Sequence, residues 1–517
     1  MAKLTDLPAE LINRIVHHVL FSAPQPATGE DEDRPKRKDL LDHDHHLLDH
    51  TQLDCALKPK PRPHRERLPN PQGHKHDPAL TYAEPVSWPE GPPDNPLLPL
   101  CLVNRTFRQY AQELLFKNVG LDSKWTASLF LKSLTCVPSH DHQSLHTHPN
   151  NDNQLQAMQA ESPRVCGLSQ HVRSLQFSWG KECSMGQGGG SMFCKIIQSC
   201  PFLENIAISN TFLLACKEPI LNALATRPRI KELVILNNTR REHSTFQWQA
   251  HEVVSRLFSR WDHLETVELS GLACWPDDSP EPAPASIPTM NCAIRTMILK
   301  DHDLDEPTLS SLIKSCADTL RTLEVTDRGH KLDRGGFCRV LQGCTSPNLE
   351  CLTIHESICW QPPLSSNLHS DDPLTSPGLL DIVFNSPEAL NNLKTLSFQG
   401  TLATGRLFER LPKSIVKLAW ERCNIPASPL IRALSTSRDN EGPLPNLKCC
   451  SVRSRYGWDP TEKTAVQQAL QLRGGCFHST LNRSYGSPAP SDDDSDDDHY
   501  VHMWDPFEDD EWEGEDG

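Results

Sequence analysis

A short pattern of apolar residues recurs along most of the chain. The pattern reads L-x-x-L-x-L, with Ile, Val, Phe or Met often replacing Leu, and it starts at residues 172, 203, 230, 264, 294, 320, 349, 393, 415 and 447. Such alternation over a few residues is typical of a half-buried strand. Between these strands, segments such as 306–316 and 335–344 place apolar residues at helical spacing. The sequence therefore predicts a long succession of strand–helix units.

The period of these units predicts the architecture. Successive starts lie roughly 22 to 44 residues apart, mostly near 30, which is a spacing found in repeat proteins. A strand and a helix at this period predict a leucine-rich-repeat (LRR) solenoid, in which each unit covers the apolar face of the next. Residues 116–121, FKNVGL, are expected to form the first strand. The predicted fold class is α/β, with the solenoid over residues 123–485.

The repeat pattern also assigns each strand residue to a side of the sheet. The fourth and sixth positions face the core, whereas the third, fifth and seventh positions face the concave surface. The expected core positions include Leu175, Phe177, Leu233, Ile235, Leu323, Val325, Leu396, Phe398, Leu418 and Trp420. The charged residues that we predict to bind a target on the concave surface are Glu232, Glu268, Lys300, Glu324, His355, Lys417, Glu421 and Arg453.

The mixed charge of the concave surface indicates the kind of ligand. These positions carry both signs and form no basic stripe of the kind that would attract nucleic-acid phosphates. A protein target therefore fits this surface better than a nucleic acid. A second interpretation stays open, in which the sheet is solvated and binding takes place on loops or edges.

Residues 7–20, LPAELINRIVHHVL, predict a helix that is apolar over a wide arc. Pro8 stands in the first turn, where its missing N–H is harmless, and Glu10 complements the positive end of the helix. The apolar positions cover about 220° of the helix circumference, whereas a helix on one core needs only about 100°. We therefore expect this helix to make two apolar contacts. Either another protein or the following domain could supply the second one.

A second helical segment, LLPLCLVNRTFRQYAQELLFKNV at 97–119, supplies the first contact. Val103, Phe107 and Ala111 begin its apolar stripe, and Asn104 is placed to cap the helix. Together with residues 7–20 it predicts a small three-helix unit, too small to bury all of its own apolar surface.

These two segments carry a resemblance to a known family. LPAELINRIVHHVL and LCLVNRTFRQYAQELLFKNV are similar to the two halves of an F-box, in particular that of fungal F-box proteins, and the pairing of an F-box with LRRs also occurs in that family. The resemblance implies binding of the Skp-type adaptor of Skp–cullin–F-box (SCF) ubiquitin ligases. The adaptor-binding residues that it implies are Leu7, Pro8, Leu11, Ile15, Leu102, Val103 and Phe107.

The chain departs from the F-box pattern in two places. About 75 residues separate the two helical segments, although the cost of closing such a loop grows only logarithmically and adds about 1–2 kcal/mol. Pro99 stands where the second helix should run, so we expect that helix to shorten to a turn.

Two segments are predicted to be disordered. Residues 22–94 are rich in Pro and His and poor in apolar residues, so they cannot offset the entropy lost on ordering. At the other end, residues 492–517 hold 14 of the acidic residues and no Lys or Arg, which accounts for nearly all of the net charge of −16. The predicted organisation is a first F-box-like helix at 1–21, an insertion at 22–94, the remaining F-box-like helices at 95–122, the solenoid at 123–485 and an acidic tail at 486–517.

The sequence offers no constellation for catalysis. Phosphate-loop and dinucleotide fingerprints are missing, and the 19 cysteines include no C-x-x-C pair. Histidines cluster at 43–46 and 140–148, in segments without a predicted framework. Cys351 and His355 share a strand face but lie about 13 Å apart there. We expect no cofactor, no metal and no enzymatic activity.

The same features suggest a compartment and a function. Scattered cysteines, an opening MAKLTDLPAE without a leader pattern and no apolar run near membrane-spanning length favour the cytoplasm or the nucleus, with no membrane partner. We interpret the chain as a substrate-recognition subunit of an SCF ubiquitin ligase. It would bind the Skp-type adaptor, and through it cullin, with its helices, and a target protein of unknown identity with its solenoid. The alternative is a non-catalytic interaction scaffold whose F-box-like unit works outside a ligase.

Overall fold

The computed structural model describes most of the predicted solenoid and the two helical segments before it. The described residues are 7–22, 97–135, 167–179, 182–209, 211–236, 246–275, 288, 290–327, 329–344, 346–355, 367, 370–386, 388–435, 442–454 and 458–481. The predictions of disorder for the insertion, apart from Ser22, and for the acidic tail fall outside these residues. The same holds for the histidine clusters at 43–46 and 140–148.

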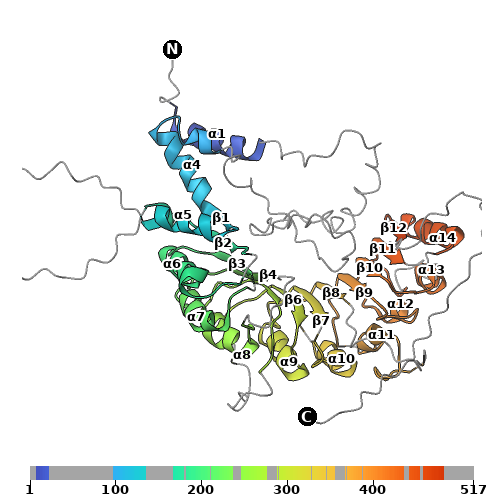
Figure 1. The fold of residues 1–517 in the computed structure, drawn as a ribbon. Coiled ribbons are helices and arrows are strands. Elements are labelled where there is room, and N and C mark those ends of the chain that lie inside the picture. Colours follow the sequence, from blue (N-terminus) through green and yellow to red (C-terminus); the bar gives the residue numbers. More distant parts are fainter. Residues whose placement is uncertain are drawn as a thin grey trace, which may run out of the picture.

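The described strands form a single sheet that curves along its whole length. Twelve parallel strands pair in the order in which they occur in the sequence, and the helices lie on the outside of the curve (Figure 1). The strands are β1 Asn118–Leu121, β2 Ser174–Phe177, β3 Asn205–Ser209, β4 Glu232–Leu236, β5 Thr266–Ser270, β6 Thr296–His302, β7 Thr322–Asp327, β8 Cys351–His355, β9 Thr395–Gln399, β10 Lys417–Glu421, β11 Cys449–Ser454 and β12 Cys476–Leu481.

The strand predictions are confirmed, with one omission. All ten pattern matches and the segment 116–121 contain an observed strand, and each strand pairs in parallel with the next. The twelfth strand, β12, was not predicted. Its residue Ser479 is the register partner of Val452, so a polar residue stands where the pattern needs an apolar one. The expected first strand at 116–121 is observed as β1, which pairs with β2, so the sheet begins before the predicted solenoid boundary at residue 123.

Helices follow most strands and cover the outer face of the sheet. They are α5 Lys124–Thr135, α6 Gly190–Ser199, α7 Lys217–Ala225, α8 Ala250–Val253 with a π-helical turn at Val254–Phe258, α9 Glu306–Ser315, α10 Arg334–Gln342, α11 Leu379–Val383, α12 Leu407–Arg410, α13 Ala427–Ser435 and α14 Pro460–Gln471. Aspartates start several of them: Asp305, Asp333 and Asp459 accept hydrogen bonds from backbone N–H groups in the first turns of α9, α10 and α14. The helices predicted at 306–316 and 335–344 are thus confirmed as α9 and α10.

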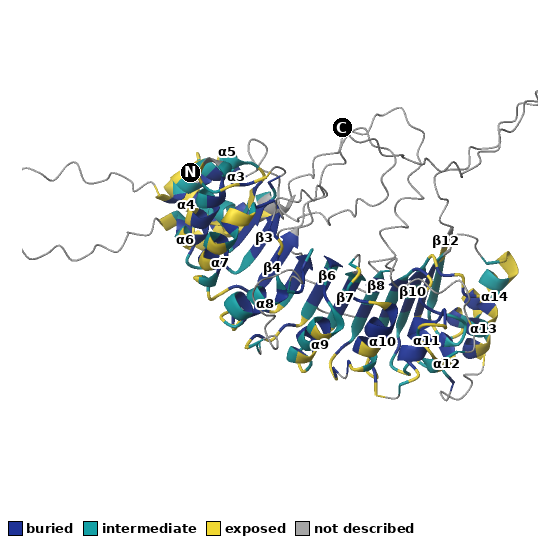
Figure 2. Ribbon diagram, turned by 60° about the horizontal axis from the view of Figure 1, so that its bottom comes forward, coloured by how far each residue is buried: buried dark blue, intermediate teal, exposed yellow. Residues whose placement is uncertain are grey.

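The core of the solenoid lies between the sheet and these helices. Figure 2 shows the strands largely buried and the exposed residues concentrated on outer helices and loops. Every predicted core position is at most 2% exposed, from Leu175 in β2 to Trp420 in β10. Aromatic rings fill the space near β10, where Trp420 lies 5.8 Å from Phe408 and 5.8 Å from Trp458 between ring centroids. The predicted core positions thus face inward. Burial alternates regularly along β8, β9 and β10, whereas in β2, β3 and β5 most of the concave positions are buried as well, with Gln176 at 2% and Ala207 at 0% exposed.

The residues before β1 form a separate helical unit with its own core. The unit consists of α1 Ala9–Ser22, α3 Leu97–Leu100 and α4 Arg105–Lys117. Its buried side chains are Ile12, Val16, Leu97, Phe107 and Ala111. As predicted, Asn104 caps α4, because its Oδ1 accepts a hydrogen bond of 2.9 Å from Phe107 N–H. The helix that contains Pro99 is only four residues long.

A buried histidine lies at the end of β6. The register between β6 and β7 shifts after Leu299, and Asp301 adopts a left-handed backbone with φ of 49°. His302 follows and is fully buried, and its Nδ1 accepts a hydrogen bond of 3.4 Å from Leu304 N–H. Burial lowers the pKa of His302 to about 4. The native protein therefore holds this imidazole neutral.

Replacing His302 by Asn is expected to make the protein less sensitive to acid. The unfolded state takes up a proton at the ordinary pKa of 6.5, whereas the native state excludes it until about pH 4. Stability is thus lost as the pH falls through this window, by up to roughly 3 kcal/mol from this residue. Asn keeps a hydrogen-bond acceptor without the titration. The check is a set of urea melts at neutral pH and in the middle of the window.

The matched control for this prediction is His263→Asn, which changes an exposed histidine. It should lose stability with acid as the parent protein does. If His302→Asn shows the same acid dependence as this control, the pKa assignment is wrong.

Candidate functional site

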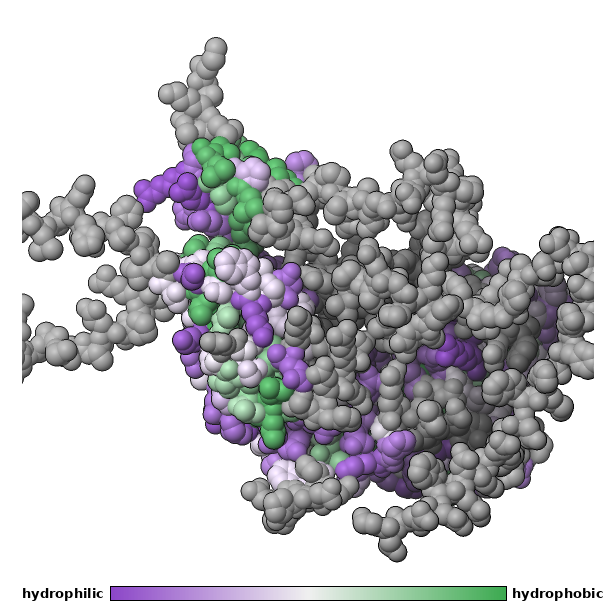
Figure 3. Space-filling view, viewed as in Figure 1, coloured by the Kyte–Doolittle hydropathy of each residue, from purple (hydrophilic) through white to green (hydrophobic). Residues whose placement is uncertain are grey.

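The helical unit carries large apolar side chains that the fold leaves exposed. Leu11 and Ile15 lie one turn apart on α1, and Leu102 and Val103 occupy the turn between α3 and α4. Their exposed fractions are 44%, 36%, 81% and 45%. Figure 3 shows apolar residues gathered over this unit. We call these four residues the apolar surface of the helical unit.

The wide apolar arc of α1 explains why part of this surface exists. Ile12 and Val16 point into the core of the unit and are 1% and 0% exposed. Leu11 and Ile15 precede them by one position each, about 100° around the helix, so the same core cannot cover them. The solenoid could have covered them instead, but the structure leaves them open. The excess apolar character predicted for this helix is therefore present as exposed surface.

The turn that bears Leu102 and Val103 is held in place from inside the unit. The Nε of Arg108 in α4 donates a hydrogen bond of 3.0 Å to the carbonyl oxygen of Cys101. The cap of Asn104 fixes the other side of the turn. These polar contacts hold the backbone of the turn in one conformation while its two apolar side chains face solvent. The turn therefore loses little conformational entropy when a partner binds.

The other residues implied by the F-box resemblance lie in different surroundings. Phe107 is only 2% exposed and belongs to the core, so it supports the apolar surface from beneath and does not line it. Leu7 is half-buried against the same core. Pro8 is exposed at the start of α1, and its carbonyl oxygen accepts hydrogen bonds from the N–H groups of Leu11 and Ile12.

Exposed apolar residues are concentrated at this end of the molecule. Among the described residues nine large apolar side chains are exposed, and six of them lie between positions 11 and 129. Besides the apolar surface of the helical unit, these are Trp125 and Leu129, one turn apart on α5. An end with such a concentration is typical of a protein-interaction site.

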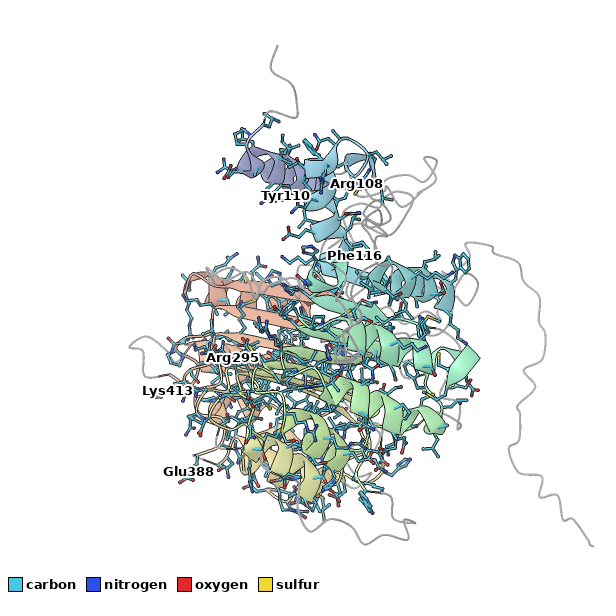
Figure 4. All side chains as sticks on the ribbon, turned by 90° about the vertical axis from the view of Figure 1, so that its left-hand side faces the viewer. Arg108, Tyr110, Phe116, Arg295, Glu388 and Lys413 are labelled. Carbon is cyan, nitrogen blue, oxygen red and sulfur yellow. The ribbon has the colours of Figure 1, made fainter. Side chains whose placement is uncertain are left out.

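The helical unit joins the solenoid without a linker. Helix α4 ends at Lys117 and β1 begins at Asn118. The Lys117 carbonyl oxygen accepts a hydrogen bond of 2.9 Å from Arg173 N–H beside β2, and the ring of Phe116 stacks on Phe130 of α5 with centroids 5.7 Å apart. Figure 4 shows Phe116 at the junction and Arg108 and Tyr110 on the part that projects from the solenoid. The direction of the helical unit is thus set by packing at its base.

The predicted target-binding residues lie on the concave surface but differ in exposure. Glu232 and Glu268 are buried, at 8% and 7% exposed, whereas the other six are half-buried. Lys300 lies between two acids, with its Nζ 3.1 Å from Glu268 and 3.8 Å from Glu324. Side chains on neighbouring strands stand about 5 Å apart and pack on one another, which explains this partial burial. The concave surface is therefore polar, with charges that compensate each other in part.

His355 and Cys351 do not form a catalytic pair. Burial lowers the pKa of His355, while Glu324 acts against this shift and Lys300 adds to it. Burial raises the pKa of Cys351, so its thiol stays protonated at neutral pH. Cys351 is the register partner of Thr322 and Thr395, and His355 of Thr326 and Gln399. The two residues thus lie four positions apart on β8, with Thr353 between them on the same face.

The structure brings together one group of residues that sequence reasoning missed. Within the described residues, the potential ligand atoms of Cys449, Cys476 and His478 all lie within 4.8 Å of one another. Burial and a hydrogen bond with Cys476 raise the pKa of Cys449 to about 12, so the Cys449 thiol is no reactive nucleophile. The group escaped notice because β12 was not predicted. The available signal was C-x-H at 476–478, one repeat period after Cys449.

Comparison with known proteins adds no assignment. No family model matches this chain, and no curated protein matches it. Among the described helices, none has the length and apolar character needed to cross a membrane. The function is therefore inferred from the residues and geometry of this chain.

Substitutions at Phe107 and Leu102 should distinguish a residue that stabilises the helical unit from one that only lines its apolar surface. Phe107→Ala removes a buried ring and is expected to destabilise the helical unit by about 3–5 kcal/mol. Leu102→Ala should change stability by no more than about 0.5 kcal/mol, because Leu102 is 81% exposed. Hydrogen exchange of α1 and α4 in the full chain measures both effects. Equal loss of protection in the two variants would contradict this division.

Proposed function

We propose that this chain is a substrate-recognition subunit of an SCF ubiquitin ligase. The helical unit would bind a Skp-type adaptor, and through it cullin, while the solenoid would hold a target protein. The observation that carries the proposal is the apolar surface of the helical unit. Leu11, Ile15, Leu102 and Val103 are exposed, and they occupy positions at which the sequence resembles an F-box.

The energetics of the apolar surface suit a protein partner. Burial of a large apolar side chain contributes about 1.5–3 kcal/mol when it passes from full exposure to full burial. Side chains that start from 36–81% exposure would contribute on the order of 1 kcal/mol each. Four such residues on fixed backbone provide several kcal/mol toward association, before its entropic cost is subtracted. This is enough to act as the centre of an interface with a polar rim.

The arrangement of the two parts suits a role in positioning. In such a ligase the chain would form no covalent bond to its target, and it would raise the concentration of the target near a loaded conjugating enzyme. A stiff connection between the adaptor-binding and target-binding parts favours this role. The direct passage from α4 into β1 and the stacking of Phe116 on Phe130 provide that stiffness.

The concave surface is our proposal for the target-binding site. Its accessible charges include Lys417, Glu421 and Arg453 toward the C-terminal end, and Arg453 Nη1 lies 3.8 Å from Glu421 Oε2. A surface with both charge signs and partial burial would discriminate among protein partners through charge complementarity. A cytoplasmic or nuclear location is part of the same proposal, since such ligases act there.

Charge placed on α1 should abolish adaptor binding. In the double variant Leu11→Asp, Ile15→Asp, binding would bury two carboxylates against an apolar partner surface. We expect the amount of co-purified Skp-type adaptor to fall at least tenfold. Leu214→Asp is the matched control, because Leu214 is 68% exposed on the solenoid, far from α1 in the chain. Both variants should melt at the temperature of the parent protein. Capture of adaptor by the double variant would show that the docking face is misplaced.

If the parent protein itself captures no adaptor, the F-box-like unit does not enter a ligase. The chain would then be an interaction scaffold of another kind. The measurement is light scattering of the chain mixed with purified adaptor. A stable complex has the summed mass of the two proteins, whereas without binding each protein keeps its own mass.

Exchange of a charge pair should test the concave surface. Glu421→Arg combined with Arg453→Glu keeps an internal ion pair but reverses the pattern that a target meets. We expect proteins that co-purify from cells with blocked degradation to decrease severalfold, while adaptor capture and melting temperature stay unchanged. If the set of co-purified proteins is unchanged, the target does not bind these charges, and its site lies on loops or edges of the solenoid.

A further inference from the structure

The last two strands of the sheet bring two thiols and an imidazole together. In the register of β11 and β12, Cys449 pairs with Cys476 and Ser451 pairs with His478. Side chains alternate along a strand, so Cys476 and His478 share a face, and register places Cys449 on that face beside Cys476. Their potential ligand atoms lie within 4.8 Å of one another. Three groups that bind soft and borderline metal ions thus converge on the concave surface.

The environment of these residues differs from that of the structural cysteines. Cys450 points to the opposite face and is fully buried in the core. Cys476 and His478 are half-buried, and Cys449 is 9% exposed. An ion can therefore reach the cluster from the concave side, whereas the core thiols behave as small apolar groups.

We propose that Cys449, Cys476 and His478 bind a zinc ion at the C-terminal end of the concave surface. This inference does not rest on the proposed function, although the cluster lies beside Lys417 of the proposed target-binding surface. Thiolate and imidazole ligands favour zinc and exclude calcium and magnesium, which take oxygen ligands.

The geometry fits a tetrahedral zinc ion after small side-chain movements. Zinc–sulfur bonds of about 2.3 Å and zinc–nitrogen bonds of about 2.0–2.1 Å place neighbouring ligand atoms about 3.5–3.8 Å apart. The observed separations are no larger than 4.8 Å. Closing the difference requires each side chain to move by less than about 1 Å, which rotation about χ1 and χ2 allows.

The charge around the cluster also fits. Two thiolates carry two negative charges and a neutral imidazole carries none, so together they balance the two positive charges of a zinc ion. The occupied site is therefore neutral. Lys417 is the register partner of Cys449 on β10, so a cation stands beside the cluster. A neutral complex is tolerated beside a lysine, whereas a site with fewer thiolates would repel it.

The position of the cluster indicates what the ion would do. Strand β12 is the last strand of the described sheet, and it pairs only with β11 there. A zinc ion held by both strands would cross-link this edge strand to its neighbour and stabilise the end of the solenoid. Three protein ligands leave the fourth coordination position for water or another donor on the concave side.

Cobalt and zinc titration of the full chain tests the proposal. The protein is purified under reducing conditions, stripped of metal with a chelator and titrated with Co²⁺, whose thiolate charge-transfer absorption reports sulfur ligands. Histidine-only binding elsewhere in the chain gives no such band. We expect one equivalent of cobalt with this band, and its displacement by one equivalent of zinc.

Variants identify the ligands. Cys449→Ser, Cys476→Ser and His478→Gln should each weaken zinc binding at least tenfold, while Cys351→Ser, a half-buried cysteine on the same surface, should leave it unchanged. Zinc should raise the melting temperature and slow hydrogen exchange of β12 in the parent protein but not in Cys476→Ser. Adaptor capture is expected to be the same in all of them.

Three results would overturn the proposal. The first is the lack of a thiolate–cobalt band in the fully reduced parent protein. The second is a band of equal intensity in the parent protein and in the Cys449→Ser and Cys476→Ser variants. The third is a disulfide between Cys449 and Cys476 that persists under the reducing conditions of a cytoplasm, shown by a mass two hydrogens below that of the reduced chain.

Discussion

The wide apolar arc of α1 is the constraint on which the functional account depends. A helix that packs on one core can hide only part of such an arc. In this chain Ile12 and Val16 fill the core of the helical unit, and Leu11 and Ile15 remain at the surface. The unit is too small to grow a second core, and the solenoid meets it at the base of α4. Exposure of these side chains therefore follows from the size and placement of the unit.

The solenoid depends on a different constraint, the alternation of side chains along parallel strands. One face of each strand is covered by the outer helices, and the other face lines the concave surface (Figure 1). Each strand adds its own residues to this surface, and some of them have chemistry that distinguishes them from the rest. They include the charges around Lys300 and the thiols and imidazole at the end of the sheet.

Much of this fold could be predicted because the period of apolar positions sets both the strands and their sides. Core positions such as Leu233 and Trp420 follow from sequence alone, since alternation leaves them no other face. Strand β12 could not be recognised in this way, because Ser479 breaks the apolar pattern. The burial of Phe107 agrees with its place in the apolar stripe predicted to contact the first helix. The burial of Glu232 and Glu268 escaped prediction. Their exposure depends on neighbours that are distant in the sequence, and a local pattern contains no information on them.

Hydrogen exchange with purified Skp-type adaptor tests the central claim most directly. The account predicts that a stable complex forms and that exchange slows in α1 around Leu11 and Ile15 and in the turn that bears Leu102 and Val103, while β8 to β12 keep the exchange rates of the free chain. Slowed exchange confined to the solenoid, or no change anywhere in the presence of excess adaptor, would contradict it.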